Sequence, residues 1–432
     1  MREIIWNQPI TQQKVAELLP RATNSNHLGQ VVQKIIQEVA SNGIDALRDH
    51  ASRFDGVVPS EFRVTREKLK EALANTPSDV RRALEEAILR LRKVSQSHLP
   101  SNKSIEITNG GTVELRFVPF DSAGVYAPGG KAVYPSSVIM NVVPAQVAGV
   151  KRIVLCSPAQ KEFGGDPHPL ILAAAELLGI DEVYAIGGAS AIAALAEGVA
   201  EIQLAPVDLV TGPGNAYVAT AKQLLRSKIA IDSEAGPTEI LVIADESANP
   251  EWIAADLISQ AEHDESAAAV LLTTSSKLIS EVSKQIELQL AKTQNRDRAS
   301  RALSGEQSAL VLVKSISDAI EIANLYATEH LEIQTQKPRD VLEKITNAGA
   351  VFLGGYSPVS LGDYLAGSNH VLPTSGQARR SSGLSVYTFL RQQQVVDFKS
   401  DSLAAVSDLL TKFADAEGLP AHGEAARIRF SN

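Results

Sequence analysis

Cysteine is almost absent from this chain of 432 residues, and its scarcity excludes two kinds of structure. The single cysteine, Cys156, cannot form a disulfide framework, which needs pairs of cysteines. It also cannot build a cage of several thiolates around a metal. A metal ion bound by this protein must therefore be held by nitrogen and oxygen ligands.

Excess positive charge and long apolar runs are also missing. Lys and Arg number 41 against 50 Asp and Glu, a formal net charge of −9, whereas a nucleic-acid-binding protein normally carries a basic face. No stretch of about 18 apolar residues is free of charge and proline, so we expect no membrane span. The opening residues, M-R-E-I-I-W-N-Q, lack the apolar run of a secretory signal. We therefore expect a soluble cytoplasmic protein without nucleic-acid or membrane partners.

Short apolar segments alternate with helix-like segments twice along the chain. The first alternation runs from about residue 123 to 244 and the second from about 249 to 355. Such alternation predicts parallel sheets covered by helices on both faces. The first 120 residues show helical periodicity instead, at 22–41, 66–74 and 78–99. We expect the histidines of this helical region to be solvated or capping residues: His27, His50 and His98.

The other candidate histidines lie in four polar clusters of the C-terminal half. They are His263 in S-Q-A-E-H-D-E, His330 in A-T-E-H-L-E, His370 in G-S-N-H-V-L-P-T and His422 in A-E-G-L-P-A-H-G-E. A neutral imidazole beside a carboxylate or amide is what both a divalent metal site and a general acid/base pair require. Any one of them could be an ordinary histidine with a hydrogen-bond partner, but four clusters favour one metal-dependent active site. The flanking groups are Gln260, Glu262, Asp264, Glu329, Asp363 and Glu417.

One of these clusters has a spacing that is typical of metal ligands. Gln260 and His263 are three residues apart on a helix that begins at Asn249-Pro250, so they share a face, as do many solvated polar pairs. Asp363 in a loop and the remote His422 could complete an N/O site for zinc or another first-row metal.

Glu329 and His330 are adjacent where a helix gives way to a strand. There a carboxylate could activate water while an imidazole takes a proton from an alcohol. The alternative is a solvated helix end.

Three glycine-rich turns follow candidate strands, at residues 127–130 (A-P-G-G), 187–190 (G-G-A-S) and 212–215 (G-P-G-N). Open α/β sheets bind nucleotides at such positions, through backbone N–H groups at helix N-termini. A full G-x-G-x-x-G is missing, because Tyr217 stands where the third glycine would be. Glycines that only permit tight turns are the alternative.

Taken in order, these motifs resemble the histidinol dehydrogenase family over essentially the whole chain. The strings that carry the resemblance are V-Y-A-P-G-G-K-A-V-Y-P-S-S-V, V-T-G-P-G-N-A-Y-V, E-A-G-P-T-E-I, D-L-I-S-Q-A-E-H, E-H-L-E-I, S-P-V-S-L-G-D-Y, G-S-N-H-V-L-P-T and A-E-G-L-P-A-H. The resemblance implies a zinc enzyme of histidine biosynthesis that oxidises L-histidinol to L-histidine in two NAD-dependent steps, through a bound aldehyde.

The resemblance also implies a role for each matching residue. Glu329 would activate the water that hydrates the aldehyde, and His330 would accept the hydroxyl proton. The implied ligands of one Zn²⁺ ion per subunit are Gln260, His263, Asp363 and His422. The implied substrate contacts are Thr238, Gln260, His263, His330, Asp363, His370, Glu417 and His422. The implied NAD contacts are Tyr126, Ser190 and Asn215.

The expected fold is α/β, with two Rossmann-like parallel-sheet domains and small helical extensions at both ends. Residues 1–24 would form an N-terminal extension, and residues 123–244 a Rossmann-like NAD-binding domain. Residues 25–122 and 245–380 would form a discontinuous α/β domain with most metal and catalytic residues. Residues 381–432 would form a C-terminal extension that crosses to the partner subunit of a homodimer, as the family's shared active sites imply.

The chain departs from the family pattern at Ser190, where the family usually has glutamine, and at Thr238, which replaces a frequent serine but keeps the hydroxyl. Two other functions remain open. One is a related dehydrogenase that acts on another small hydroxyl compound, such as a sulfonated diol. The other is an inactive metal-binding or regulatory protein, which the presence of both Glu329 and His330 disfavours.

Overall fold

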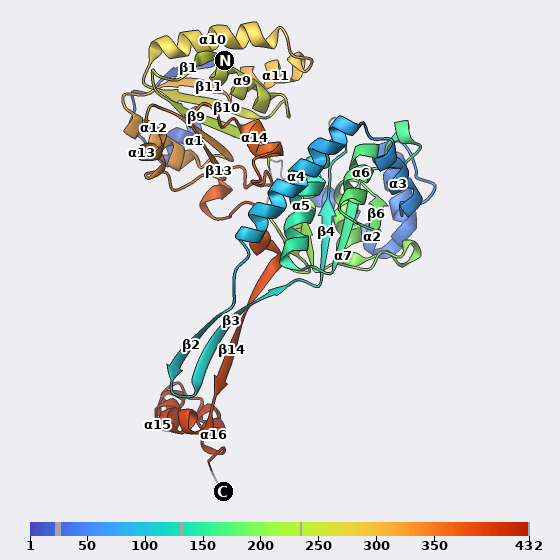
Figure 1. Cartoon of the computed structure of the whole chain (residues 1–432), viewed down its shortest axis with the longest axis vertical. Helices are drawn as coiled ribbons and strands as arrows, with labels where there is room; N and C mark the ends of the chain where they lie inside the picture. The colour runs from blue at the N-terminus through green and yellow to red at the C-terminus, as the bar shows by residue number, and fades with distance from the viewer. Residues whose placement is uncertain (22–26, 130–132, 234–235, 431–432) are drawn as a thin grey trace.

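The computed structural model describes residues 1–21, 27–129, 133–233 and 236–430. Two domains, each built on a parallel sheet, lie side by side, and a long arm extends away from them to the C-terminus (Figure 1). The expected α/β class with two parallel sheets is confirmed. None of the described helices is long and apolar enough to span a membrane.

The six-stranded sheet has the order β1-β11-β10-β9-β12-β13, with every pairing parallel. Its strands are β1 (Arg2–Ile5), β9 (Glu239–Ala244), β10 (Ala268–Thr273), β11 (Ala309–Leu312), β12 (His330–Gln334) and β13 (Ala350–Leu353). Alternate residues of β9 pack into two different apolar clusters, one on each face, as the two-residue period of a strand requires. Helices α9 (Pro250–Ala261), α10 (Ser276–Leu290) and α11 (Arg296–Ser304) cover one face, and α1 (Gln12–Leu18), α12 (Ile316–Tyr326) and α13 (Pro338–Leu342) the other.

The five-stranded sheet is also parallel, with the order β6-β5-β4-β7-β8. Its strands are β4 (Ser122–Tyr126), β5 (Arg152–Ser157), β6 (Glu182–Ala185), β7 (Leu209–Thr211) and β8 (Ala230–Ile231). Helices α3 (Arg66–Ala74), α4 (Ser78–Ser97), α5 (Pro135–Ala148) and α6 (Pro169–Leu177) cover one face, and α2 (His27–His50), α7 (Gly188–Glu197) and α8 (Ala216–Leu225) the other. The strand order reverses between β4 and β7. In open α/β sheets, ligands bind beyond the carboxyl ends of the strands at such a reversal.

The packing corrects the expected division of the chain. Helices α2, α3 and α4, which we expected to join residues 245–380, bury their apolar faces against the five-stranded sheet instead. Strand β1 and helix α1, expected to be an extension, form the edge and part of the cover of the six-stranded sheet. An amphipathic stripe shows that a helix is covered but not which sheet covers it, so the sequence pattern could not decide between the two sheets.

The arm consists of a three-stranded antiparallel sheet followed by two helices (Figure 1). The sheet has the order β14-β3-β2: β3 (Gly111–Pro119) pairs with its neighbour β2 (Lys103–Thr108) and, across a long sequence separation, with β14 (Leu390–Phe398). Helices α15 (Ser400–Ala416) and α16 (Pro420–Arg427) complete it. The two helices agree with the expected helical C-terminal extension, whereas the three strands were not expected from the sequence.

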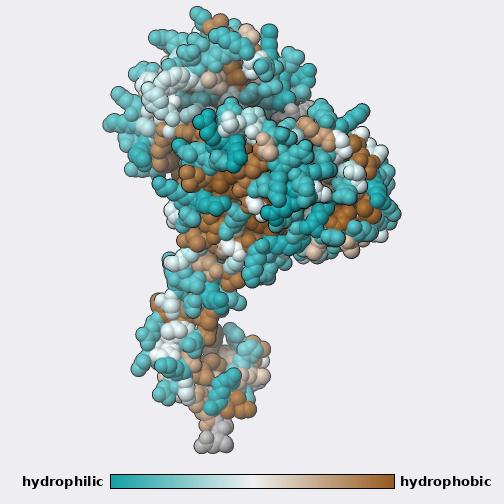
Figure 2. Space-filling model, turned by 45° about the vertical axis from the view of Figure 1, so that its right-hand side comes forward, coloured by the Kyte–Doolittle hydropathy of each residue, from teal (hydrophilic) through white to brown (hydrophobic). Residues whose placement is uncertain are grey.

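The surface of the arm carries large apolar side chains that are at least 60% exposed (Figure 2). They are Ile105, Ile107, Val396, Leu409, Phe413 and Ile428. Apolar side chains gathered this densely on a projecting segment are typical of a surface that another molecule covers.

Candidate active site

One large cleft, of about 1340 Å³, is lined by residues of both domains. The five-stranded sheet contributes the carboxyl ends of its strands, at Tyr126 and at the turn that precedes Asn215. The six-stranded sheet contributes the opposite, amino ends: Thr238 precedes β9, and His330 is the first residue of β12. The volume exceeds the range of about 300–1,000 Å³ that is usual for a small-molecule site. The cleft therefore has room for two ligands or one extended ligand beside a smaller one.

Glu329 is buried in this cleft and is held by two donors. Its Oε2 accepts hydrogen bonds from Thr238 Oγ1 at 2.5 Å and from the backbone N–H of Glu239 at 2.9 Å. Burial outweighs these bonds and raises the pKa of the Glu329 carboxyl to about 8. Once deprotonated, a carboxylate with such a pKa is a stronger base toward water than a carboxylate with an ordinary pKa.

His330 presents a free basic nitrogen to the same cleft. Its Nδ1 lies 3.1 Å from the carbonyl oxygen of Glu239, so Nδ1 carries the proton and donates it. Its Nε2 is buried and has no hydrogen-bond partner among the described residues. Burial lowers the pKa of the ring. His330 is thus a neutral imidazole with an available lone pair, as a general base requires.

Three of the expected zinc ligands lie beside these bases. Gln260 lies in the last turn of α9, where its Nε2 donates to Thr238 Oγ1 while its buried Oε1 finds no partner in the described part of the chain. His263 donates from Nδ1 to the carbonyl oxygen of Ser259 at 3.0 Å, which leaves Nε2 available. Asp363 lies in α14 (Val359–Tyr364). Burial raises the pKa of its carboxyl, while the nearby His263 ring favours the charged form of that carboxyl.

An unpartnered amide oxygen, an imidazole nitrogen and a carboxylate are oxygen and nitrogen donors of the kinds that zinc accepts. The residues present therefore fit the ion. A fourth donor is not supplied nearby: the described residues of one chain contain no group of three or more His, Cys, Asp and Glu side chains arranged for a metal.

His422 and Glu417, the remaining expected ligand and substrate contact, do not join the cleft within one chain. His422 lies in α16 and Glu417 caps the end of α15, both on the arm and both exposed. His370 does line the cleft. Its Nδ1 lies 3.1 Å from the carbonyl oxygen of Asp363, and burial lowers the pKa of its ring to about 4, so this imidazole is neutral.

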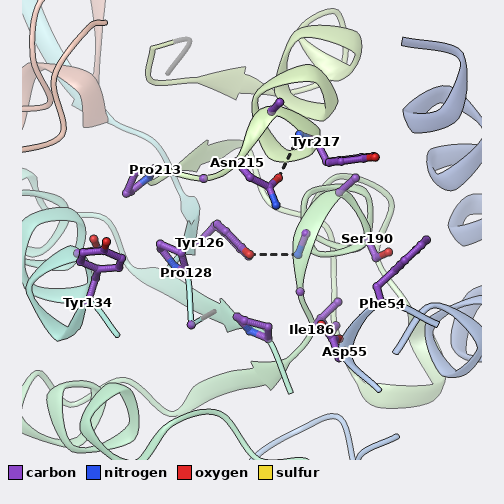
Figure 3. Close-up of a pocket in the computed structure, with 18 of the residues that line it drawn as sticks. Phe54, Asp55, Tyr126, Pro128, Tyr134, Ile186, Ser190, Pro213, Asn215 and Tyr217 are labelled. Carbon is purple, nitrogen blue, oxygen red and sulfur yellow. Dashed lines mark hydrogen bonds between the residues drawn. The ribbon is translucent and has the colours of Figure 1, made fainter. Parts of the chain in front are cut away.

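The three expected NAD contacts meet at the reversal point of the five-stranded sheet (Figure 3). The buried hydroxyl of Tyr126 accepts from the N–H of Gly188 at 3.1 Å, and burial raises the pKa of Tyr126 to about 12. Asn215 Oδ1 caps α8 by accepting from the N–H groups of Tyr217 at 3.0 Å and Val218 at 3.2 Å. Ser190 lies in the first turn of α7.

The glycine of the turn after β7 has a demonstrable steric role. Gly212 has φ = 115°, and a Cβ there would lie 2.1 Å from the carbonyl oxygen of Tyr126. Any side chain would therefore separate the turn from β4 and deform the reversal point. Gly130, in the first glycine-rich turn, lies outside the described residues.

Sequence reasoning missed part of the cleft wall. His50, expected to be solvated or capping, is only 2% exposed and contacts Ser190. Phe54 and Asp55, from the π-helical turn η1 (Ala51–Asp55), also line the cleft (Figure 3). No local sequence signal distinguishes these residues from an ordinary helix end. His98 is exposed at the C-terminal end of α4, as expected, and the side chain of His27 lies outside the described part of the structure.

Comparison with known proteins gives a consistent result. The family model for histidinol dehydrogenase matches residues 19–430. The histidinol dehydrogenase of Corynebacterium diphtheriae is 51% identical over 429 residues, covering 98% of this chain and 95% of the relative, and that of Leifsonia xyli subsp. xyli is 54% identical over 400 residues, covering 93% and 92%. The crystal structure of histidinol dehydrogenase from Elizabethkingia anophelis superposes with a TM-score of 0.94 at 36% identity, covering 100% of this chain and 98% of that one. The chain therefore belongs to the histidinol dehydrogenase family.

Proposed function

We propose that this protein oxidises L-histidinol to L-histidine in two NAD-dependent steps, with the intermediate aldehyde held in the cleft and one zinc ion per subunit. The observation that carries the proposal is the pair Glu329 and His330. These two bases have different environments and lie side by side in the cleft. On one side of them is the point where the strand order of the five-stranded sheet reverses, and on the other are the oxygen and nitrogen donors. Their roles and those of the surrounding residues are assigned here as part of the proposal.

In the first step, His330 Nε2 would accept the proton of the substrate hydroxyl, and bound NAD would supply the acceptor for the hydride of the carbinol carbon. The neutral form of His330, favoured by its burial, is the form able to do this. In the second step, Glu329 removes a proton from the water that attacks the aldehyde. His330 would then take a proton from the resulting hydrate, whose hydride would pass to a second molecule of oxidised NAD, and this yields the carboxylic acid.

A zinc ion at this site would fix the imidazole and amine of the substrate, so that its carbinol carbon faces the nicotinamide. Gln260 Oε1, His263 Nε2 and the Asp363 carboxylate would hold the ion. His370 and Thr238 would border the substrate. Tyr126, Ser190 and Asn215 would contact NAD at the reversal point.

The fourth ligand, His422, and the substrate contact Glu417 would come from a second subunit. Both residues are exposed on an arm that projects from the domains and carries large exposed apolar side chains. In a homodimer, the arm of each chain would cover these side chains and complete the site of the other. Catalysis in the cytoplasm is part of the same proposal.

Histidinol is favoured over a sulfonated diol because the relatives that match the chain at 51% identity or more are named histidinol dehydrogenases. An assay of purified protein tests the proposal, with NAD and with L-histidinol, histidinal and unrelated alcohols offered side by side. We expect two NADH to form for each L-histidinol consumed, and little NADH from the other alcohols. Equal or faster oxidation of a diol, or a final ratio of one NADH per histidinol, would contradict the proposal.

A further inference from the structure

A buried histidine connects the NAD side of the cleft to a carboxylate. His50, the last residue of α2, lies with its Nδ1 2.9 Å from Ser190 Oγ and its Nε2 2.9 Å from Glu38 Oε2. His50 is 2% exposed and Ser190 is 4% exposed, yet both line the cleft together with Glu38. No step of the proposed reaction uses His50 or Glu38.

The charge of Glu38 fixes the direction of the hydrogen bond at its end of this chain of contacts. The bond from His50 is the largest of the influences that lower the pKa of Glu38, so Glu38 is a carboxylate and can only accept. Nε2 of His50 therefore carries a proton and donates it. When the ring is neutral, Nδ1 is an acceptor, and the Ser190 hydroxyl donates its own proton to His50.

This direction limits what Ser190 can offer to a ligand. Its single proton is directed at His50, so only the lone pairs of Oγ remain for the cleft. Phe54 packs against the His50 ring, with the ring centroids 5.6 Å apart, and borders the cleft beside it. In Figure 3, Ser190 and Phe54 lie on one side of the pocket and Tyr134 on the other.

We propose that Glu38 and His50 are positioning residues that hold Ser190 as a hydrogen-bond acceptor toward the cofactor. This end of the cleft would then select a donor of the dinucleotide, such as a ribose hydroxyl or an amide or amine N–H. The inference rests on the proposed NAD-dependent function. It adds a residue pair that acts on the cofactor through Ser190 and does not touch the zinc side of the cleft.

The test compares five full-length variants with the wild type, one of which is the double variant Ser190→Ala/His50→Gln. Ser190→Ala removes the acceptor. His50→Gln places its amide near the Nε2 position, so it can still reach Glu38 but offers nothing at Nδ1. His50→Asn places its amide near the Nδ1 position and can still accept from Ser190. His98→Gln is the matched control, because His98 is exposed at the end of α4.

The measurements are NADH affinity by fluorescence titration, the KM values for NAD and histidinol, and thermal unfolding to confirm folding. A single hydrogen bond is worth on the order of 1 kcal/mol, which is roughly a fivefold change in affinity. We expect Ser190→Ala and His50→Gln each to weaken NADH binding by about three- to tenfold, with the KM for histidinol unchanged. The double variant should bind no more weakly than either single variant, and His50→Asn should bind more tightly than His50→Gln.

Additive losses in the double variant, equal losses in His50→Asn and His50→Gln, or a parallel rise in the KM for histidinol would overturn the inference while leaving the proposed function intact. So would NADH binding to Ser190→Ala at the wild-type affinity. Wild-type protein that binds no NADH at all would overturn both the proposed cofactor and this inference.

Discussion

Thr238 donates its hydroxyl proton to Glu329 at 2.5 Å and accepts a hydrogen bond from Gln260, so one side chain joins the candidate water-activating base to a candidate zinc ligand. The bond to Glu329 lowers the pKa of that carboxyl against the larger effect of burial. Thr238 therefore sets how readily Glu329 is available as a base.

Replacing Thr238 tests this control of the base. Thr238→Val removes the hydroxyl with little change of shape, so the pKa of Glu329 should rise above about 8. Because only the deprotonated carboxyl accepts a proton, the pH at half-maximal histidinal oxidation should move upward. Thr238→Ser keeps the hydroxyl and should retain the wild-type profile. Coincident pH profiles for the valine variant and the wild type, at equal metal content, would count against this role.

Removing the base itself should separate the two oxidation steps. Glu329→Gln keeps the size of the side chain but cannot accept a proton, and the loss of a general base typically costs about 10²–10⁴-fold in rate. We expect the loss to fall on the oxidation of supplied histidinal more than on the formation of aldehyde from histidinol. The measurement is the ratio of the two rates at saturating NAD. Histidinal oxidation within a few-fold of wild type would show that Glu329 does not activate water.

Metal removal should abolish turnover, and zinc or another first-row divalent ion should restore it. His263→Ala should weaken metal binding more than Gln260→Ala, because an imidazole nitrogen is generally a stronger zinc ligand than an amide oxygen. Metal content per subunit after dialysis, measured alongside activity, checks both statements. Full activity in exhaustively demetallated protein would exclude the zinc site.

A shared active site should show complementation between subunits. A His263→Ala chain and a His422→Ala chain are each expected to be inactive as homodimers. In a hybrid dimer, one site collects both lesions and the other is intact, so an equal mixture refolded together should recover about a quarter of the wild-type activity. Wild-type protein refolded in parallel controls for yield. Activity no higher than that of the parents would mean that His422 does not serve the neighbouring subunit.

A buried acidic pair behind the site should make stability depend on pH. Burial raises the pKa of Asp256 to about 6 and that of Glu332 well above its usual value, and Gln334 Nε2 donates to both carboxyls. Groups whose pKa is raised by folding stabilise the protein below their unfolded pKa, near 4, and that stability is lost as the pH rises through the folded pKa.

Glu332→Gln cannot ionise, and its amide oxygen can still accept from the N–H of Val359. One pKa unit corresponds to about 1.4 kcal/mol, so the loss of stability between pH 5 and pH 8 should shrink by on the order of 1–2 kcal/mol. Chemical denaturation at the two pH values measures this difference. An unchanged difference between the variant and the wild type would refute the prediction.

The sequence predicts the two sheets well because their strands are short, apolar and separated by helices, a pattern that fits few other folds. It does not predict the arm. Strand β3 pairs with β14 from Leu390 to Phe398, some 270 residues away, and neither segment carries a sequence signal that identifies the other as its partner. The same limit applies to the site. Glu329 and His330 are conspicuous as neighbours, whereas His50 resembles any polar helix end until the fold brings it to Ser190.

The two sheets present opposite ends of their strands to the cleft, and the helices next to these strands also meet the cleft with opposite ends. Helices α7 and α8 begin at the NAD side of the cleft, so the positive ends of their dipoles face the place where an anionic diphosphate would lie. Helix α9 ends at Ala261, between Gln260 and His263, so the negative end of its dipole lies near the place where a cation and a protonated amine would lie. The backbone thus gives the two sides of the cleft opposite partial charges, which favour an anionic group at one side and a cationic group at the other.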